Sequence, residues 1–359
     1  MHLTESAVMQ ALGKVMEPEL HRDLVTLKMI RDVKIAGGDV ALTVVLTTPA
    51  CPLKSTIEAD VRKAVEAVPG VRRVTVAWDA NVPGDARLSS RLDLPMRSTI
   101  AVASGKGGVG KSTVAVNLAV ALAALGARTG LLDADIYGPN VPLMMGVEDM
   151  PPPDAESKKM VPAEAYGVEM MSMAFLVRPE QPIIWRGPML HSAIRQFLTD
   201  VRWGTLDYLV IDLPPGTGDA ALSLAQSVPL TGAVIVTTPQ QVARMDVVRS
   251  IEMFKKLEVP VLGIVENMSY FEQPDGQKVY MFGQGGGRSL AEEYGVPLLG
   301  EIPLDPRIGA GGDAGRPIVV SVPESVPAAA FRTAAQSLAA RLSVMNLTET
   351  SVIPLLQVR

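Results

Sequence analysis

One glycine-rich segment carries the residue types and the spacing that bind phosphate. It reads Ser104-Gly105-Lys106-Gly107-Gly108-Val109-Gly110-Lys111-Ser112-Thr113. Glycines let successive backbone N–H groups converge on phosphate oxygens at the start of a helix. The spacing Gly-x-x-x-x-Gly-Lys-Ser predicts that Lys111 contacts the β- and γ-phosphates and that Ser112 coordinates Mg²⁺. We therefore expect residues 105–113 to bind a nucleoside triphosphate.

The same segment contains one lysine more than a phosphate-binding loop requires. Lys106 stands five residues before Lys111. The loop leaves two interpretations open. Lys106 is either a solvated surface lysine or a second catalytic cation, directed at the triphosphate across a dimer interface.

Three aspartates follow apolar segments and can complete the chemistry of the site. Asp212 precedes a Pro-Pro-Gly turn, and Asp133 and Asp135 are two residues apart. A carboxylate at the end of a buried strand can orient Mg²⁺, and a second one can orient the attacking water. We predict that Asp212 and Asp133 lie on the metal side and that Asp135 orients the water. The alternative for each is an ordinary carboxylate at a turn.

These side chains must be positioned by strands and helices that alternate along the chain. The phosphate loop lies between a predicted strand and the apolar helix 114–125, as the motif requires. Such an alternation predicts an α/β fold with a mostly parallel sheet and helices on both of its faces. The predicted strands are 100–103, 129–132, 208–211, 233–236 and 261–265.

A polar segment rich in proline and glycine divides the chain. Before it, residues 4–17 and 53–67 are predicted helices, and 26–35, 39–47 and 71–77 are predicted strands. We therefore expect a small α+β domain ahead of the larger one. The predicted divisions are a small domain at 1–79, a linker at 80–97, a P-loop ATPase domain at 98–345 and a C-terminal tail at 346–359.

Composition excludes several functional classes. The chain has 359 residues, of which 48% are hydrophobic, and this allows a sizeable core. A net charge of -5 without a Lys/Arg run argues against nonspecific nucleic-acid binding. No charge-free stretch is apolar enough for a membrane span, and no secretory signal opens the chain. We expect a cytoplasmic protein that binds neither nucleic acid nor membranes.

Several motifs together resemble one family of nucleotide switches. The phosphate loop is similar to the deviant Walker A loop of MinD/ParA-like ATPases, and further motifs resemble the Mrp/ApbC branch, described as iron–sulfur cluster carriers. The N-terminal region resembles the small domain often fused to this branch. The motifs that carry the resemblance are 133–139, 185–189, 212–219, 266–269 and 282–287, with 17–20, Asp23 and 47–52 in the small domain.

The resemblance implies roles that spacing alone does not give. It implies ATP as the nucleotide, a homodimer in which Lys106 contacts the partner's nucleotide, and apoprotein clients and cluster scaffold proteins as further partners. By the same analogy, Asn267 contacts the adenine edge and Pro303 packs near the base.

The sequence departs from the family where a cluster would be held. A Cys-x-x-Cys pair usually follows the Asn-Met-Ser motif, but residues 270–278 contain no cysteine. A [4Fe-4S] cluster takes four thiolates, whereas one chain offers only Cys51 and a homodimer offers two. Cys51 is therefore either a cluster ligand that needs other thiols or a small half-buried apolar residue.

Two functions follow as expectations. The first is a dimeric, Mg²⁺-dependent ATPase that carries iron–sulfur clusters, with slow hydrolysis resetting a conformational switch. The alternative is a metal-free, MinD/ParA-like scaffold or partitioning switch gated by ATP, which the missing cysteine pair keeps open.

Overall fold

The computed structural model describes residues 3–91, 94–176 and 187–350. The chain divides into two compact units. The smaller comprises the described parts of Met1–Pro83 and Ala339–Arg359, and the larger comprises those of Gly84–Leu338. Residues 351–359 of the predicted tail, residues 92–93 of the predicted linker and residues 185–186 of one family motif lie outside the described ranges.

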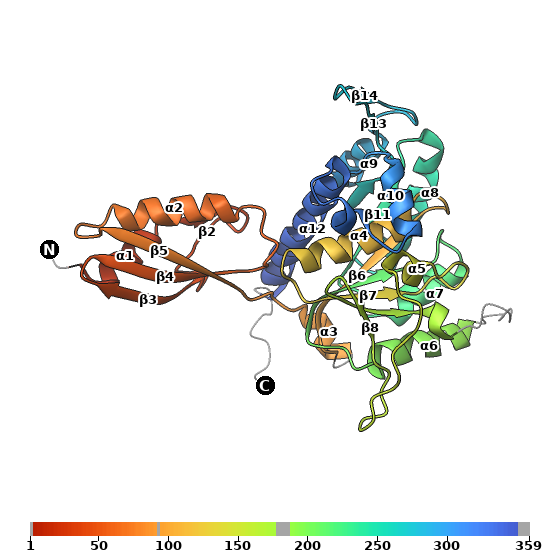
Figure 1. Cartoon of the computed structure of the whole chain (residues 1–359), viewed down its shortest axis with the longest axis horizontal. Coiled ribbons are helices and arrows are strands. Elements are labelled where there is room, and N and C mark those ends of the chain that lie inside the picture. Colours follow the sequence, from red (N-terminus) through yellow and green to blue (C-terminus); the bar gives the residue numbers. More distant parts are fainter. Residues whose placement is uncertain (1–2, 92–93, 177–186, 351–359) are drawn as a thin grey trace, which may run out of the picture. The chain divides into compact units, whose positions relative to one another are not determined.

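The smaller unit is built on a sheet whose described strands run in the order β3-β4-β5 (Figure 1). β3 and β4 are antiparallel, whereas β4 and β5 are parallel and are therefore joined by the crossover helix α2. Ile57, Val61 and Val65 recur every four residues on α2 and are buried in this unit's core. The elements are α1 (Glu5–Leu12), β1 (Met16–Glu17), β2 (Arg22–Asp23), β3 (Ile30–Ala36), β4 (Asp39–Leu46), α2 (Lys54–Glu66) and β5 (Arg73–Ala80).

The first predicted helix is shorter than the sequence pattern suggests. The prediction over 4–17 is wrong beyond Leu12, and β1 pairs with β2 instead. Pro18 disfavours helical backbone at the preceding residue, Glu17. The buried Glu17 carboxylate also accepts the N–H of Glu19 at 2.9 Å, which stabilises a turn.

The larger unit contains a mostly parallel sheet. In the described part of the chain it has eight strands in the order β15-β12-β11-β6-β10-β7-β9-β8, and among these neighbours only β8 and β9 pair antiparallel. All five predicted strands are present. The bounds are β6 (Met96–Ser104), β7 (Thr129–Asp133), β8 (Ala163–Ala165), β9 (Val168–Ser172), β10 (Leu206–Asp212), β11 (Gly232–Thr237), β12 (Val261–Glu266) and β15 (Leu298–Glu301), with a separate hairpin of β13 (Phe271–Glu272) and β14 (Lys278–Val279).

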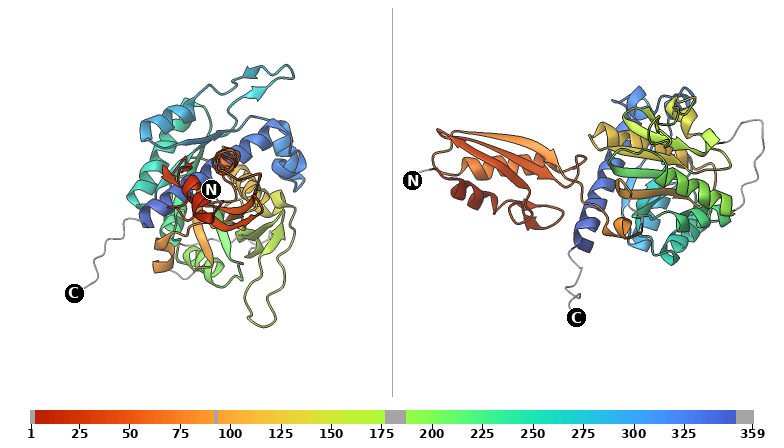
Figure 2. Two further views of the ribbon diagram at one scale, coloured as in Figure 1. Left: turned by 90° about the vertical axis from the view of Figure 1, so that its left-hand side faces the viewer. Right: turned by 90° about the horizontal axis from the view of Figure 1, so that it is seen from below.

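Helices cover both faces of this sheet (Figure 2). Leu209 and Ile211 of β10 pack in one apolar cluster with residues of α6, α7, α8 and α9, whereas α4 contacts β6, β7 and β10 outside that cluster. The predicted fold class is confirmed. The helices are α3 (Ala86–Arg91), α4 (Lys111–Ala124), α5 (Val141–Met145), the 3₁₀ helix η1 (Met173–Leu176), α6 (Gly187–Thr199), α7 (Asp219–Ser227), α8 (Gln241–Lys256), α9 (Gly286–Tyr294), α10 (Pro306–Asp313), α11 (Ile318–Ser321) and α12 (Val326–Thr350).

Two stretches predicted as linker and tail contain helix. α3 lies within 80–97, and α12 continues to Thr350. In the smaller unit, the end of α12 is fixed by Ser343, whose Oγ donates to the Thr47 carbonyl at 3.2 Å. Within the described ranges, no helix combines the length and apolar character needed to cross a membrane.

Candidate nucleotide-binding site

The phosphate loop connects the end of β6 to the start of α4. Gly108 and Gly110 have φ angles of 78° and 81°, which favour glycine. A Cβ on Gly105 would lie 2.3 Å from the backbone carbon of Asp246 on α8, so no side chain fits there without movement. The loop therefore has the glycines that its backbone and its packing require.

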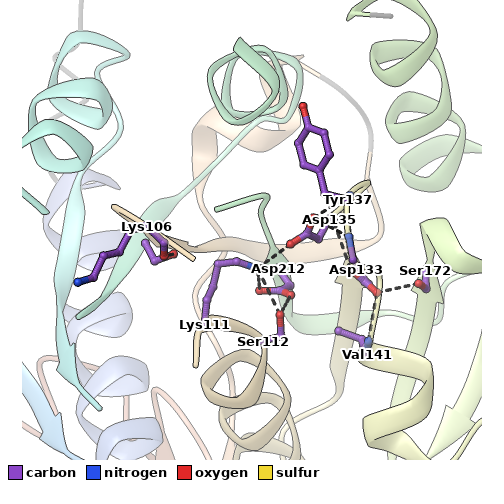
Figure 3. Close-up of polar contacts among 11 residues, drawn as sticks. Lys106, Lys111, Ser112, Asp133, Asp135, Tyr137, Val141, Ser172 and Asp212 are labelled. Atoms are coloured by element: carbon purple, nitrogen blue, oxygen red, sulfur yellow. Dashed lines mark hydrogen bonds and ion pairs between the residues drawn. The ribbon is translucent and has the colours of Figure 1, made fainter. Parts of the chain in front are cut away.

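Lys111 and Ser112 both contact the carboxylate of Asp212 (Figure 3). The Nζ of Lys111 donates to Oδ1 at 2.7 Å, and the Oγ of Ser112 donates to Oδ2 at 2.5 Å. Asp212 is fully buried, and Lys111 is 6% exposed. Residues 101 positions apart in the chain thus form one ion pair, because the adjacent parallel strands β6 and β10 end side by side.

Opposing effects act on the pKa of Asp212. Burial raises the pKa of the Asp212 carboxyl, while the charge of Lys111 and the hydrogen bonds from Lys111 and Ser112 lower it. The three side chains therefore depend on one another electrostatically. A hydroxyl and a carboxylate oxygen side by side are also the hard donors that Mg²⁺ prefers.

Asp135 is the second acidic neighbour of Lys111. Its Oδ2 lies 3.6 Å from the Nζ of Lys111. The backbone N–H of Tyr137 donates to Oδ1 of Asp135 at 3.0 Å, so the turn after β7 holds this carboxylate. Asp135 is nearly buried, yet it lines the hollow over the phosphate loop.

Asp133 is not among the residues that line this hollow. Its Oδ2 accepts the hydroxyl of Ser172 at 2.8 Å and the N–H of Val141 at 3.3 Å (Figure 3). Burial and the neighbouring charge of Asp212 raise the pKa of Asp133 to about 8. The hydrogen bonds of Asp133 therefore connect β7 to β9 and α5 next to the site. Its predicted role on the metal side stays a prediction.

A hollow of about 430 Å³ lies over the loop. The sequence did not predict Asn140 and Met144 as lining residues, because neither stands in a phosphate-binding motif. Both follow Asp135 closely in the segment after β7, and this proximity was the only signal that could have indicated them. The hollow is lined by Ser104, Lys106, Gly107, Gly108, Gly110, Lys111, Ser112, Thr113, Asp135, Tyr137, Gly138, Asn140, Met144 and Pro215.

Lys106 points away from the ion pair at the centre of the site. Figure 3 shows its side chain directed away from Lys111 and Asp212. The carbonyl of Lys106 accepts the Ser104 hydroxyl at 2.9 Å, which fixes its backbone. Both lysines of the loop line the hollow, but their side chains point in different directions.

The two residues predicted to contact the base lie in different places. Asn267 contacts the phosphate loop, since its Nδ2 donates to the Val109 carbonyl at 2.8 Å. Pro303 lines a separate cavity of about 420 Å³, together with Phe271 and Leu304. The structure thus brings Asn267 to the loop, but neither Asn267 nor Pro303 is among the residues that line the hollow over it.

Cys51 lies in the smaller unit. It is half-buried against that unit's core. Burial raises the pKa of its thiol, and the charges of Glu19 and Glu17 add to this increase. Among the described residues, no group of three or more His, Cys, Asp or Glu side chains could hold a metal ion.

Comparisons with known proteins agree with this arrangement. Residues 95–339 match the model of the NUBPL iron-transfer P-loop NTPase family, and residues 5–78 match that of an iron–sulfur cluster assembly protein. An iron–sulfur cluster carrier protein of Synechocystis sp. is 53% identical over 355 residues, covering 96% of this chain and 99% of its own. One from Deinococcus radiodurans is 55% identical over 345 residues, covering 96% and 97%.

Solved structures support the same fold. A nucleotide-binding protein from Archaeoglobus fulgidus in complex with ADP has 42% identity and a TM-score of 0.56, over 64% of this chain and 90% of that one. The cell division ATPase MinD of Pyrococcus furiosus has 26% identity and a TM-score of 0.52, over 67% and 98%. The resemblance drawn from the sequence is confirmed: the chain belongs to the NUBPL iron-transfer P-loop NTPase family, and a region that matches an iron–sulfur cluster assembly protein precedes its P-loop region.

Proposed function

We propose that this chain is an ATP-hydrolysing carrier that binds iron–sulfur clusters and transfers them to apoproteins. The observation that carries the proposal is the contact of Lys111 and Ser112 with Asp212 beneath a phosphate loop, in a chain 53% identical to a cluster carrier. ATP acts as a conformational switch of a homodimer, and hydrolysis is slow.

The site residues suit the complex of Mg²⁺ with ATP. Backbone N–H groups of residues 105–113 bind the phosphates, with Lys111 at the β- and γ-phosphates. Ser112 and Asp212 provide oxygen ligands for Mg²⁺, and a bound Mg²⁺ neutralises charge that develops on the phosphates. Phosphate oxygens compete with Asp212 for the Lys111 ammonium, so binding rearranges the ion pair between the start of α4 and the end of β10.

Hydrolysis to ADP and phosphate needs an oriented water. Asp135 is the residue that we assign to it, because its carboxylate faces the hollow and is held by the N–H of Tyr137. Lys106 supplies a second cation to the nucleotide of the partner subunit. The side chain of Lys106 points away from the Lys111–Asp212 ion pair of its own subunit, which supports this assignment.

The cluster is cargo, and one chain does not hold enough ligands for it. Cys51 is the single cysteine, whereas a [4Fe-4S] cluster takes four thiolates. A cluster bound at Cys51 must therefore share thiols from the partner subunit, a scaffold protein, a client or a small molecule. Such incomplete ligation suits transient holding and transfer.

Anaerobic reconstitution tests the cargo. Wild type and Cys51→Ser are loaded with iron and sulfide in the presence of a thiol, and iron, sulfide and the absorption spectrum are measured, followed by transfer to an apo-ferredoxin. We expect a cluster on wild type and little on Cys51→Ser. Equal loading of both would exclude Cys51 as a ligand, and loading of neither would exclude the carrier function.

A metal-free switch gated by ATP is the second candidate. The absence of cysteine from residues 270–278 favours it. It predicts nucleotide-dependent dimerisation without any bound iron. The same reconstitution therefore separates the two functions, provided that ATP hydrolysis is measured on the same preparation.

A further inference from the structure

The segment 266–269 contacts the phosphate loop through the side chain of Asn267. The Nδ2 of Asn267 donates to the carbonyl oxygen of Val109 at 2.8 Å. Asn267 is 5% exposed, so water competes little for this hydrogen bond. The contact joins residues 158 positions apart in the chain.

The amide of Asn267 occupies the space next to a glycine of the loop. A Cβ on Gly110 would lie 2.2 Å from the Nδ2 of Asn267. Gly110 also has a φ of 81°, so both its conformation and its neighbour require glycine. The loop and the amide therefore fit closely at this position.

The segment that carries Asn267 is itself firmly held. The buried carboxylate of Glu266 accepts the hydroxyl of Ser269 and the N–H of Gly287, both at 2.5 Å. The N–H of Asn267 donates to the Thr237 carbonyl at 2.7 Å. Met268 has a φ of 55°, a conformation that persists in a residue with a side chain only where its surroundings impose it.

Peptide geometry links this contact to phosphate binding. The carbonyl of Val109 and the N–H of Gly110 belong to one planar trans peptide and point in opposite directions. A carbonyl that is directed at Asn267 therefore directs the Gly110 N–H away from Asn267. Gly110 lines the hollow over the loop, which is where a phosphate group would be bound.

We propose that Asn267 is a positioning residue for the phosphate loop, in addition to its predicted contact with adenine. A carbonyl can only accept, so the Asn267 amide must present its Nδ2 to Val109. The loop is thus oriented for phosphate even when the ligand has no base. This inference rests on the proposed nucleotide binding.

Inorganic tripolyphosphate with Mg²⁺ is the probe, because it has the phosphates of ATP and no base. We expect Asn267→Asp to weaken tripolyphosphate binding about tenfold in calorimetry, the loss of one buried hydrogen bond. Asn267→Ser removes the amide without adding a charge and should act in the same direction. Asn81→Asp makes the same chemical change at an exposed position of the smaller unit and should leave the affinity unchanged.

The outcomes separate this inference from the proposed function. If both Asn267 variants bind ATP more weakly than wild type but bind tripolyphosphate equally well, Asn267 contacts only the base. That result would overturn the inference. A wild type that binds neither ATP nor tripolyphosphate would overturn the proposed function instead. If wild type binds only ATP, amide hydrogen exchange of residues 106–111 decides: faster exchange in Asn267→Asp supports the inference, and equal exchange overturns it.

Discussion

At the scale of single residues, the positive charge of Lys111 lies between the two acidic side chains of the site. Its ammonium contacts Asp212 at 2.7 Å and Asp135 at 3.6 Å. We predict that Lys111→Ala lowers ATP turnover about a hundredfold or more, because triphosphate charge loses its main counterion. The measurement is phosphate release at saturating ATP and Mg²⁺.

Removing Lys111 also leaves the buried carboxylate of Asp212 without its counterion, so the experiment must check that the variant is folded. Lys256→Ala, at an exposed position on α8, is the matched variant and should keep wild-type turnover. Circular dichroism verifies that Lys111→Ala is folded. Undiminished turnover of folded Lys111→Ala would show that this loop is not the triphosphate-binding loop.

The reactivity of Cys51 is a second property of a single residue. Burial raises the pKa of its thiol above the ordinary value of 9.0, and only the thiolate reacts with iodoacetamide. The thiolate is the disfavoured form, so we expect slow alkylation at pH 7 and a rate that still rises beyond pH 9. Mass spectrometry of the modified chain gives the rate at each pH, with Cys51→Ser as the blank, and a plateau below pH 9 would contradict the prediction.

At the scale of elements, the phosphate loop depends on its contact with α8. A Cβ on Gly105 would overlap the backbone of Asp246, whereas a Cβ on Gly107 meets nothing within 4 Å. We predict that Gly105→Ala destabilises the fold by about 1–3 kcal/mol, as overpacking does. Gly107→Ala is the matched control, and thermal unfolding without nucleotide compares the two; equal melting temperatures would show that α8 moves aside freely.

How much the sequence predicts also differs between elements. The strands β6, β7, β10, β11 and β12 are apolar runs next to recognisable motifs, and all were predicted. β8 and β15 were missed because they are only 3 and 4 residues long, too short for a periodic signal. β9 was missed as well; it is 5 residues long, and its Met170 and Met171 are fully buried.

The sequence likewise predicts only part of the candidate site. The sequence predicts that the three aspartates lie where strands end, and in the structure Asp133 and Asp212 are the last residues of β7 and β10, with Asp135 two residues beyond β7. Spacing does not give the direction of each side chain, which depends on partners distant in the sequence. Ser172, 39 residues from Asp133, accounts for the direction of that carboxylate.

At the scale of the whole molecule, the proposed arrangement is a pair of copies in which each Lys106 acts on the partner's nucleotide. Lys106 lines the hollow, but its side chain points away from Lys111. If Lys106 acts on the partner's nucleotide, Lys106→Ala should abolish most hydrolysis while ATP binding to the monomer is retained. Phosphate release and calorimetry measure the two properties, and an equal loss of both would argue for a role within one subunit.

Mixing two inactive variants gives a sharper test of the same arrangement. In a mixed dimer of Lys106→Ala with Lys111→Ala, the subunit that keeps Lys111 receives an intact Lys106 from its partner, so one of the two sites is complete. Random exchange between symmetric dimers should then restore about a quarter of wild-type turnover. If Lys106 serves its own subunit, each site of the mixed dimer lacks one lysine and no activity returns, because no exchange of subunits can then assemble both ammonium groups around one triphosphate.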